Sequence, residues 1–301
     1  MSTPMSSQSP SAGGGPVIAI HAGAGRVPVG DDGEERRQGL LAALEDAAAV
    51  LSGGGSALDA AQAAVAHMED RVDLFNAGRG SALCGDGTVE MAAAVMRGAD
   101  QAAGAVAAIG RIRQPVLAAR AVLDESPHVL MVGAAAEAVA RRAGVAEADP
   151  SYFITDRQRG RLREAGSMFE GGTVGAVCRD AAGELAAATS TGGMRGQAPG
   201  RIGDSPLIGA GTWADGGVAV SCTGDGEVFI RVGVARLIAA WVGAGVSVAD
   251  AAAAALDAVD GLGGHGGLIA VDSAGEVTMP FHDGAMPRGL WRAGQLAAVW
   301  V

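Results

Sequence analysis

Hydrophobic and polar positions along the chain fall into two kinds of pattern, short apolar runs and alanine-rich helical repeats. The apolar runs predict strands at 16–21, 88–96, 104–109, 129–132, 173–178, 185–189, 206–213 and 218–222, and a final hairpin at 268–280. The helical repeats predict helices at 32–51, 56–70, 114–125, 134–143, 155–164, 228–242 and 248–259. The strands do not alternate strictly with the helices, which favours stacked antiparallel sheets with helices on their outer faces.

Local signals at the ends of these elements support the assignment. Ser56-x-x-Asp59 and Ser247-x-x-Asp250 are typical starts of helices, and Pro115 suits a first helical turn. The segment 145–170 departs from both patterns, with a proline, a Tyr-Phe pair and several arginines, and it is the one clear candidate for a linker. It ends close to Thr173.

Composition and charge restrict the class of protein. The chain has 301 residues, 49% of them hydrophobic, which is enough for one large α/β domain or two smaller ones. The net charge is −11 and all 22 basic residues are arginine, without a basic run, so nucleic acids and anionic membranes are poor partners. Residues 1–14 read as a disordered polar tail without a signal peptide. Three scattered cysteines favour the cytoplasm.

Several familiar chemistries lack support in the sequence. The five histidines form no i,i+4 pair and no serine lies in a G-x-S-x-G elbow, which argues against a zinc hydrolase and a Ser-His-Asp enzyme. The turn at 22–25 follows a strand, but it lacks the third glycine of a dinucleotide fingerprint.

Glycine-rich polar turns in the second half carry the candidate chemistry. In the turn at 200–206, Arg201 and Asp204 could clamp the carboxylate and ammonium of an α-amino acid, although a salt bridge within the turn is the simpler alternative. Thr223 and the Gly224 N–H could face an oxyanion, or Thr223 could simply cap the following helix. Thr173 follows two glycines, which permit unusual backbone geometry or merely mark a strand entry.

Taken together and in this order, the motifs resemble the plant-type asparaginase and isoaspartyl peptidase family, whose members are N-terminal-nucleophile hydrolases. The resemblance covers nearly the whole chain. It rests on IHAGAG, SALDAAQAAV, LFNAGRGS, DGTVEM, GGTVGAV, AAATSTGGM, PGRIGDSPLIGAG, VSCTGDGEVFIR and LGGHGGLIAVD.

The resemblance implies an α+β fold, a four-layer αββα sandwich made as an inactive precursor. The Thr173 hydroxyl would attack the Gly172 carbonyl and cut the chain into an alpha subunit, 15–172, that ends in a flexible linker, and a beta subunit, 173–301. Both would remain in one structural domain. The freed amine, with a pKa of roughly 7.7 in model peptides, could act as base for the threonine hydroxyl.

Position-by-position matching implies the roles of individual residues. Thr191 would assist the nucleophile, and the substrate would lie against Arg201 and Asp204, with Asn76 near the site. Thr223 and Gly224 would form the oxyanion hole. A loop from Met68 to Ala77 matches one that wraps a structural sodium through backbone carbonyls, and no other cofactor is implied.

The implied activity is hydrolysis of L-asparagine and β-aspartyl dipeptides through an aspartyl-threonine ester, in a homodimer of cleaved protomers. Two alternatives remain open, a glycosylasparaginase-like amidase and an uncleaved member that only binds amino acids. Four positions depart from the family pattern and put the substrate preference in question, namely Ala22, Ala92, Asp225 and His265.

Overall fold

Two β-sheets form the centre of the molecule. The computed structural model describes residues 14–25, 33–164, 172–282 and 284–301. The larger sheet has the order β12-β11-β1-β5-β6-β2-β3-β4, and the smaller one β10-β9-β8-β7. Their strands are β1 (Val17–Ala22), β2 (Met91–Arg97), β3 (Ala103–Ile109), β4 (Leu130–Val132), β5 (Val174–Arg179), β6 (Leu185–Thr191), β7 (Thr212–Ala214), β8 (Val218–Gly224), β9 (Gly266–Asp272), β10 (Val277–Thr278), β11 (Arg288–Arg292) and β12 (Ala298–Trp300). All ladders are antiparallel except that of β3 with β4.

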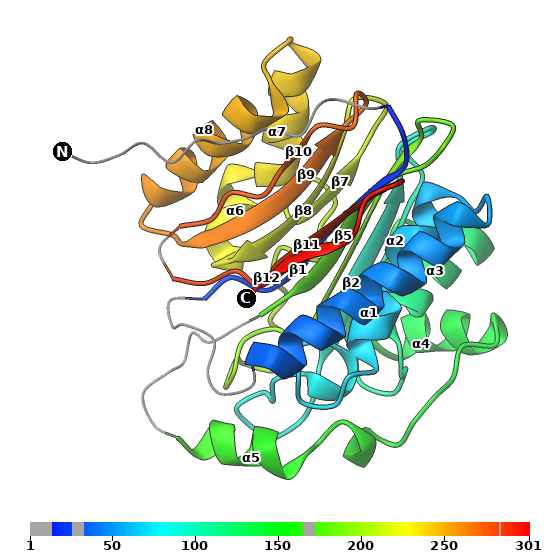
Figure 1. The fold of residues 1–301 in the computed structure, drawn as a ribbon. Helices are drawn as coiled ribbons and strands as arrows, with labels where there is room; N and C mark the ends of the chain where they lie inside the picture. The colour runs from blue at the N-terminus through cyan, green and yellow to red at the C-terminus, as the bar shows by residue number, and fades with distance from the viewer. Residues whose placement is uncertain (1–13, 26–32, 165–171, 283) are drawn as a thin grey trace.

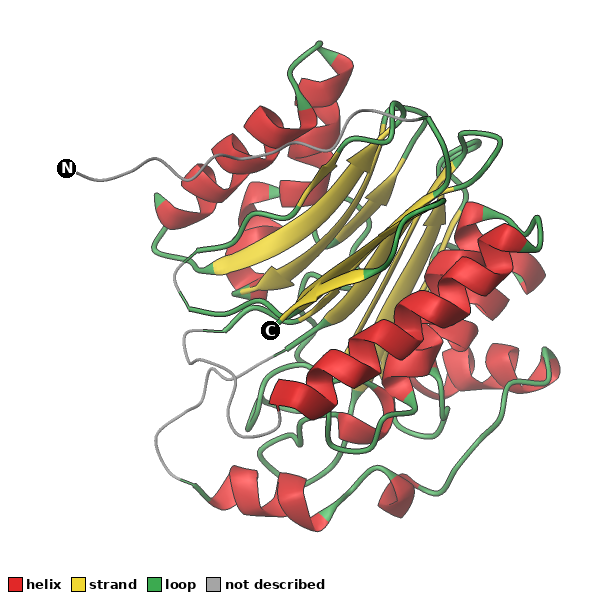
Figure 2. Ribbon diagram, in the orientation of Figure 1, coloured by secondary structure: helices red, strands yellow, loops and turns green. Residues whose placement is uncertain are grey.

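Helices cover the outer face of each sheet, so the layers run helix, sheet, sheet, helix (Figure 1). The larger sheet is covered by α1 (Gly33–Ser52), α2 (Ala57–Glu69), α3 (Pro115–Glu125) and α4 (Gly133–Arg142), and the smaller one by α6 (Gly226–Val232), α7 (Val234–Gly243) and α8 (Val248–Asp260). Helix α5 (Asp156–Arg163) lies away from both sheets (Figure 2). The Ser56 and Ser247 hydroxyls accept hydrogen bonds from the backbone N–H groups of Asp59 and Asp250, so both predicted caps are confirmed.

The layer between the two sheets is apolar at one end and polar at the other. Alternate residues of a strand share one face, and the members of this inter-sheet core include Val17, Ala19, Val177, Ala187 and Ala219. Farther along the same strands, toward one end of the sandwich, the residues on this shared face are polar. They are His21, Thr173, Thr189, Thr191, Ser221 and Thr223. Because neighbouring strands are antiparallel, these polar residues meet at the same end.

The predicted αββα sandwich is confirmed, but two predicted elements differ and two strands were not predicted. The strand expected at 206–213 is wrong: tight turns run through Leu207 and Gly209, and only β7 is a strand. The single helix expected at 228–242 is divided by Gly233, whose φ of 68° is left-handed. Strands β11 and β12 were not predicted, because their half-exposed residues lack a clear alternation.

Candidate active site

Thr173 lies at the polar end of the inter-sheet layer, one residue before β5, with 7% of its surface exposed. In the ladders that flank it, Val174 is paired with Ser190 on one side and with Ala22 on the other. Thr191 ends β6 and lies opposite Ala92 of β2. The sheet register thus brings Thr173 and Thr191 together, although 18 residues separate them in the chain.

The carbonyl group of Gly172 is held by two hydrogen-bond donors. Asn76 Nδ2 donates to its oxygen at 2.7 Å, and the Thr191 hydroxyl donates at 3.0 Å. The Thr173 hydroxyl donates to Thr191 Oγ1 at 3.3 Å. A continuous path for a proton therefore leads from the Thr173 hydroxyl through Thr191 to the Gly172 oxygen.

Asn76 is fixed by its own contacts. Its Oδ1 accepts from the Ala82 N–H at 2.7 Å and its Nδ2 also donates to the Gly193 carbonyl at 2.7 Å. The backbone N–H of Gly192 donates to the Asn76 carbonyl. These bonds fix the amide orientation, with nitrogen toward Gly172.

Gly23, rather than Ala22, is the residue of the 22–25 turn that needs glycine. Gly23 has a φ of +97°, and a Cβ there would lie 2.9 Å from the Cα of Gly172. Ala22 lies in regular β1 geometry, paired with Val174, and outside the positive-φ region. The alanine at position 22, where the family pattern usually has glycine, therefore fits without backbone strain.

Arg201 and Asp204 converge on Gly226, at the start of α6. A Cβ on Gly226 would lie 2.9 Å from Arg201 Nη2 and 3.0 Å from Asp204 Oδ1, so glycine leaves room for both groups. Arg201 forms its ion pair with Glu227 (Nε to Oε1 2.8 Å, Nη2 to Oε2 2.9 Å) rather than within its own turn. A salt bridge between Arg201 and Asp204, the simpler alternative, is therefore not the pairing adopted.

The Asp204 carboxyl is 4% exposed, and its Oδ2 has no hydrogen-bond partner within the described residues. Burial raises the pKa of this carboxyl to about 7. A buried carboxylate oxygen without a partner is costly for a folded protein, and a ligand ammonium would satisfy it.

Thr223 and Gly224 end β8 beside the 22–25 turn. The Thr223 hydroxyl accepts from the Ala24 N–H at 3.2 Å, and the residue at the N-cap position of α6 is Asp225 rather than Thr223. Gly224 has a φ of +151° and lies too close to the His265 carbonyl for any Cβ. Asp225 and His265, two of the positions that depart from the family pattern, contact each other: the Asp225 carboxylate accepts from the His265 N–H at 2.8 Å.

Three residues that the sequence patterns did not single out contact this site. Gln197 is buried, and its Oε1 accepts from the Met194 N–H at 2.9 Å and from Arg201 Nη1 at 3.3 Å. Glu227 pairs with Arg201, and the His21 imidazole lies within reach of the Thr173 backbone. Only Glu227 had a usable signal, an acidic residue three positions after Gly224 in the TGDGE motif.

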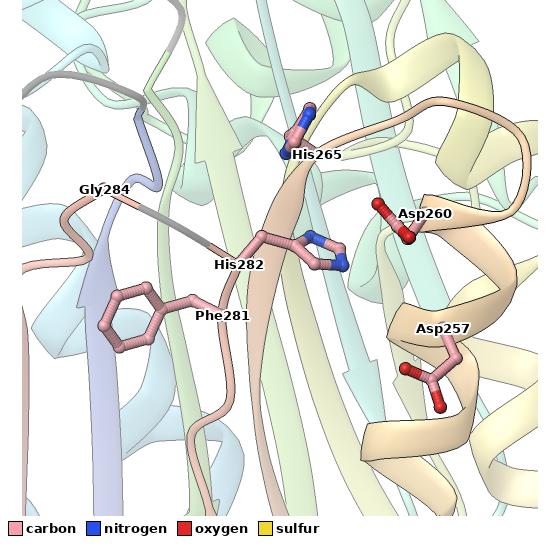
Figure 3. Close-up of a pocket in the computed structure, with 6 residues that line it drawn as sticks. All are labelled: Asp257, Asp260, His265, Phe281, His282 and Gly284. Carbon is pink, nitrogen blue, oxygen red and sulfur yellow. The ribbon is translucent and has the colours of Figure 1, made fainter.

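A hollow of about 510 Å³ lies near the start of β9 and is lined by Asp257, Asp260, His265, Phe281, His282 and Gly284 (Figure 3). None of these six is a candidate site residue. The His282 ring is engaged, with Nδ1 accepting from the Gly266 N–H at 3.0 Å and Nε2 lying 3.2 Å from the Leu256 carbonyl oxygen. Across the described ranges, no three His, Cys, Asp or Glu side chains are arranged to hold a metal ion.

The two stacked sheets with helices on their outer faces define the fold class: an αββα sandwich of the N-terminal-nucleophile hydrolase type. The family model described as asparaginase matches residues 14–301, and the chain belongs to this family of amidohydrolases. It is similar to the isoaspartyl peptidase of Salmonella typhimurium (47% identical over 300 residues, 92% of this chain and 96% of the relative) and to that of Escherichia coli (43% identical, 92% and 93%). The Homo sapiens isoaspartyl peptidase/L-asparaginase is 39% identical over 293 residues, 93% of this chain and 94% of the relative.

Proposed function

We propose that this protein cuts its own chain before Thr173 and then hydrolyses L-asparagine and β-aspartyl dipeptides. The observation that carries the proposal is the Gly172 carbonyl, which is held by Asn76 and Thr191 next to the Thr173 hydroxyl. Intact mass after purification tests the first step: two chains, the second beginning at Thr173, support it. A single uncut chain that binds but does not hydrolyse asparagine would support the amino-acid binder instead.

In self-cleavage, Thr173 Oγ attacks the Gly172 carbonyl carbon. Its proton passes to Thr191, whose own hydroxyl proton passes to the carbonyl oxygen, and the Asn76 amide stabilises the charge that develops there. Collapse of this tetrahedral intermediate breaks the C–N bond while the proton on the former carbonyl oxygen passes to the departing nitrogen, which leaves an ester between Gly172 and Thr173 with a free amine. Water then hydrolyses the ester, giving residues 1–172, which contain the alpha subunit 15–172 and the tail that precedes it, and residues 173–301. The 165–171 part of the linker lies outside the described residues.

In turnover, the new Thr173 amine takes the proton from its own hydroxyl, which attacks the β-carbonyl of the substrate. Thr223 and the Gly224 N–H stabilise the oxyanion. Ammonia leaves from asparagine, or an amino acid leaves from a β-aspartyl dipeptide, and water hydrolyses the remaining aspartyl ester. Arg201 binds the α-carboxylate and Asp204 the α-ammonium, which supplies the partner that Asp204 Oδ2 lacks.

Asp204 predicts a pH dependence of substrate binding. Burial raises the pKa of this carboxyl to about 7 in the free enzyme, so below that pH it becomes neutral and can no longer pair with an ammonium group. We expect KM for asparagine to rise by about tenfold for each pH unit below 7. The Thr173 amine titrates in a similar pH range, but its protonation lowers kcat rather than substrate binding. KM and kcat are therefore measured separately from pH 5.5 to 8.5.

Asp204→Asn is the matched control for this profile. The amide keeps the shape of the side chain but does not titrate, so its KM is expected to be high and independent of pH. A wild-type KM that stays constant between pH 5.5 and 8 would exclude Asp204 as the ammonium ligand.

A structural sodium ion in the loop from Met68 to Ala77 is part of the proposal. Gly78 and Gly80 lie so close to the carbonyl oxygens of Glu69 and Phe75 that any Cβ would collide with them, so the loop packs tightly against backbone oxygens. These oxygens are ligands that a hard cation accepts. The ion would stabilise the loop that presents Asn76.

Sodium is therefore expected to raise the melting temperature. Replacing NaCl with choline chloride at constant ionic strength should lower Tm by several degrees, because the ion binds the folded state alone. Lithium chloride and potassium chloride serve as controls for the size of the cation. Identical melting curves in all four salts would remove sodium from the proposal.

The remaining proposals concern partners and location. We propose a homodimer of cleaved protomers, small amino-acid or dipeptide substrates and a cytoplasmic location; the last is supported by three cysteines that are all free and buried. Within the described part of the chain, no helix is long and apolar enough to span a membrane.

A further inference from the structure

Four polar side chains lie fully buried between the two sheets, behind the candidate nucleophile. They are His21 of β1, Thr189 of β6, Thr212 of β7 and Ser221 of β8, and each has 0% of its surface exposed. Neither proposed reaction uses them. Buried polar groups are expensive unless each finds a partner, so their arrangement calls for an explanation.

The four groups form a single file of hydrogen bonds. His21 Nε2 lies 3.0 Å from Ser221 Oγ, Ser221 Oγ lies 2.8 Å from Thr189 Oγ1, and Thr189 Oγ1 lies 2.7 Å from Thr212 Oγ1. The last contact joins Thr212 Oγ1 to the backbone carbonyl oxygen of Ser205 at 2.9 Å. We call these five groups the buried chain.

Donor and acceptor roles are defined at the two ends of the buried chain. Thr212 Oγ1 donates toward Thr189 Oγ1 and toward the Ser205 carbonyl oxygen, which can only accept. At the other end, the backbone N–H of Gly23 donates to His21 Nδ1 at 3.4 Å, which places the ring proton on Nε2. Ser221 Oγ therefore accepts from His21 Nε2, while either hydroxyl can be the donor in the contact between Ser221 and Thr189.

His21 holds this tautomer without charge. Complete burial lowers the pKa of its imidazole to about 3, so the ring is neutral near pH 7. Gly175 of β5 makes room for the ring, because a Cβ there would collide with both His21 Nε2 and Ser221 Oγ. The buried chain therefore depends on a glycine two residues after Thr173.

The two ends touch the two halves of the candidate site. The His21 imidazole lies within reach of the Thr173 backbone, and Gly23 lies against the Gly172–Thr173 peptide. Ser205 follows Asp204, the proposed ligand of the substrate ammonium. The larger sheet supplies His21 and Thr189, and the smaller sheet supplies Ser221 and Thr212.

We propose that the buried chain is a positioning device, which fixes the nucleophile strand of one sheet relative to the substrate clamp on the other. The inference rests on the proposed function, because it assumes that Thr173 is the nucleophile and Asp204 a substrate ligand. Its members touch no substrate. They hold Thr173 at a set distance from the bound β-carbonyl, and a misplacement of about 1 Å in such a geometry can cost on the order of 100-fold in rate.

The test compares two substitutions at Thr189. Thr189→Val keeps the shape but removes the hydroxyl, whereas Thr189→Ser keeps the hydroxyl. In fully cleaved protein, Thr189→Val is expected to lower kcat by about tenfold with KM changed less than about threefold, because the clamp residues remain. Thr189→Ser should restore most of kcat. Ser190→Ala is the matched control, because this neighbouring buried hydroxyl bonds to Glu69 on the opposite face of β6.

A double-mutant cycle distinguishes positioning from stability alone. In a single file, any missing link interrupts the whole chain, so Ser221→Ala combined with Thr212→Val should lower kcat no more than either substitution alone. The proposal would be overturned if the double variant lowered kcat by the product of the two single effects. It would also be overturned if the variants had a lower melting temperature but an unchanged kcat. Equal losses in Thr189→Ser and Thr189→Val would do the same. Failure of the proposed function would appear differently, as a wild-type protein that neither cleaves itself nor hydrolyses asparagine.

Discussion

Thr173→Ala is expected to yield one uncut chain without measurable hydrolysis of asparagine or β-aspartyl dipeptides. Alanine lacks the hydroxyl that attacks Gly172, and the uncut chain also lacks the amine that would act as base. Loss of a nucleophile commonly lowers kcat by on the order of 10⁴-fold or more, here below detection. Intact mass and a coupled ammonia assay measure both consequences.

Thr173→Ser is the matched control for the nucleophile. Serine keeps the hydroxyl and the amine, and loses one methyl group in a position that is 7% exposed. Slow but complete cleavage and reduced activity are expected from it. A Thr173→Ala protein that still divides into two chains, with the second starting at residue 173, would refute the assignment.

Arg201→Ala is expected to raise KM for asparagine by roughly 30- to 100-fold, with kcat changed only a few-fold. A hydrogen bond to a charged group contributes about 1.5–3 kcal/mol, and the bidentate geometry of guanidinium is suited to the α-carboxylate. In the free protein Arg201 is 16% exposed and faces Glu227, which is 55% exposed. A substrate carboxylate can therefore exchange with Glu227.

Two controls separate substrate binding from the ion pair itself. Glu227→Gln removes the same ion pair but leaves the guanidinium, so its KM is expected to stay near that of the wild type. Asparaginol lacks the α-carboxylate, and for this compound wild type and Arg201→Ala should have similar KM values. An equal rise in KM for asparagine in Arg201→Ala and Glu227→Gln would mean that Arg201 only organises the site and does not bind the substrate carboxylate.

Much of the secondary structure followed from local patterns, and the exceptions have a local cause. Helices such as α2 and α8 combine a serine cap with an alanine-rich repeat, and both were predicted to within a residue. The expected strand at 206–213 was wrong because apolar residues there alternate with turn glycines. Chain folding, rather than hydrophobicity, decides whether such a segment pairs with a neighbouring strand.

The proposed residues of the site were recognisable only in part. Thr173, Arg201 and Asp204 were singled out because they lie in glycine-rich turns with ordered motifs. His21, Gln197 and Ser221 carry no such mark, since a buried histidine, glutamine or serine within an apolar run has many structural explanations. Their partners are as distant in sequence as 200 residues for His21 and Ser221.

The sequence by itself determined the family, the layered fold and the candidate nucleophile, because periodicity and ordered motifs are local properties. The tertiary structure alone decided which donors meet the Gly172 carbonyl, that Arg201 pairs with Glu227, and that a file of buried hydroxyls joins the two sheets. Hydrogen bonds depend on distances of about 3 Å and on direction. Those quantities exist only once antiparallel strands have placed residues from opposite ends of the chain side by side.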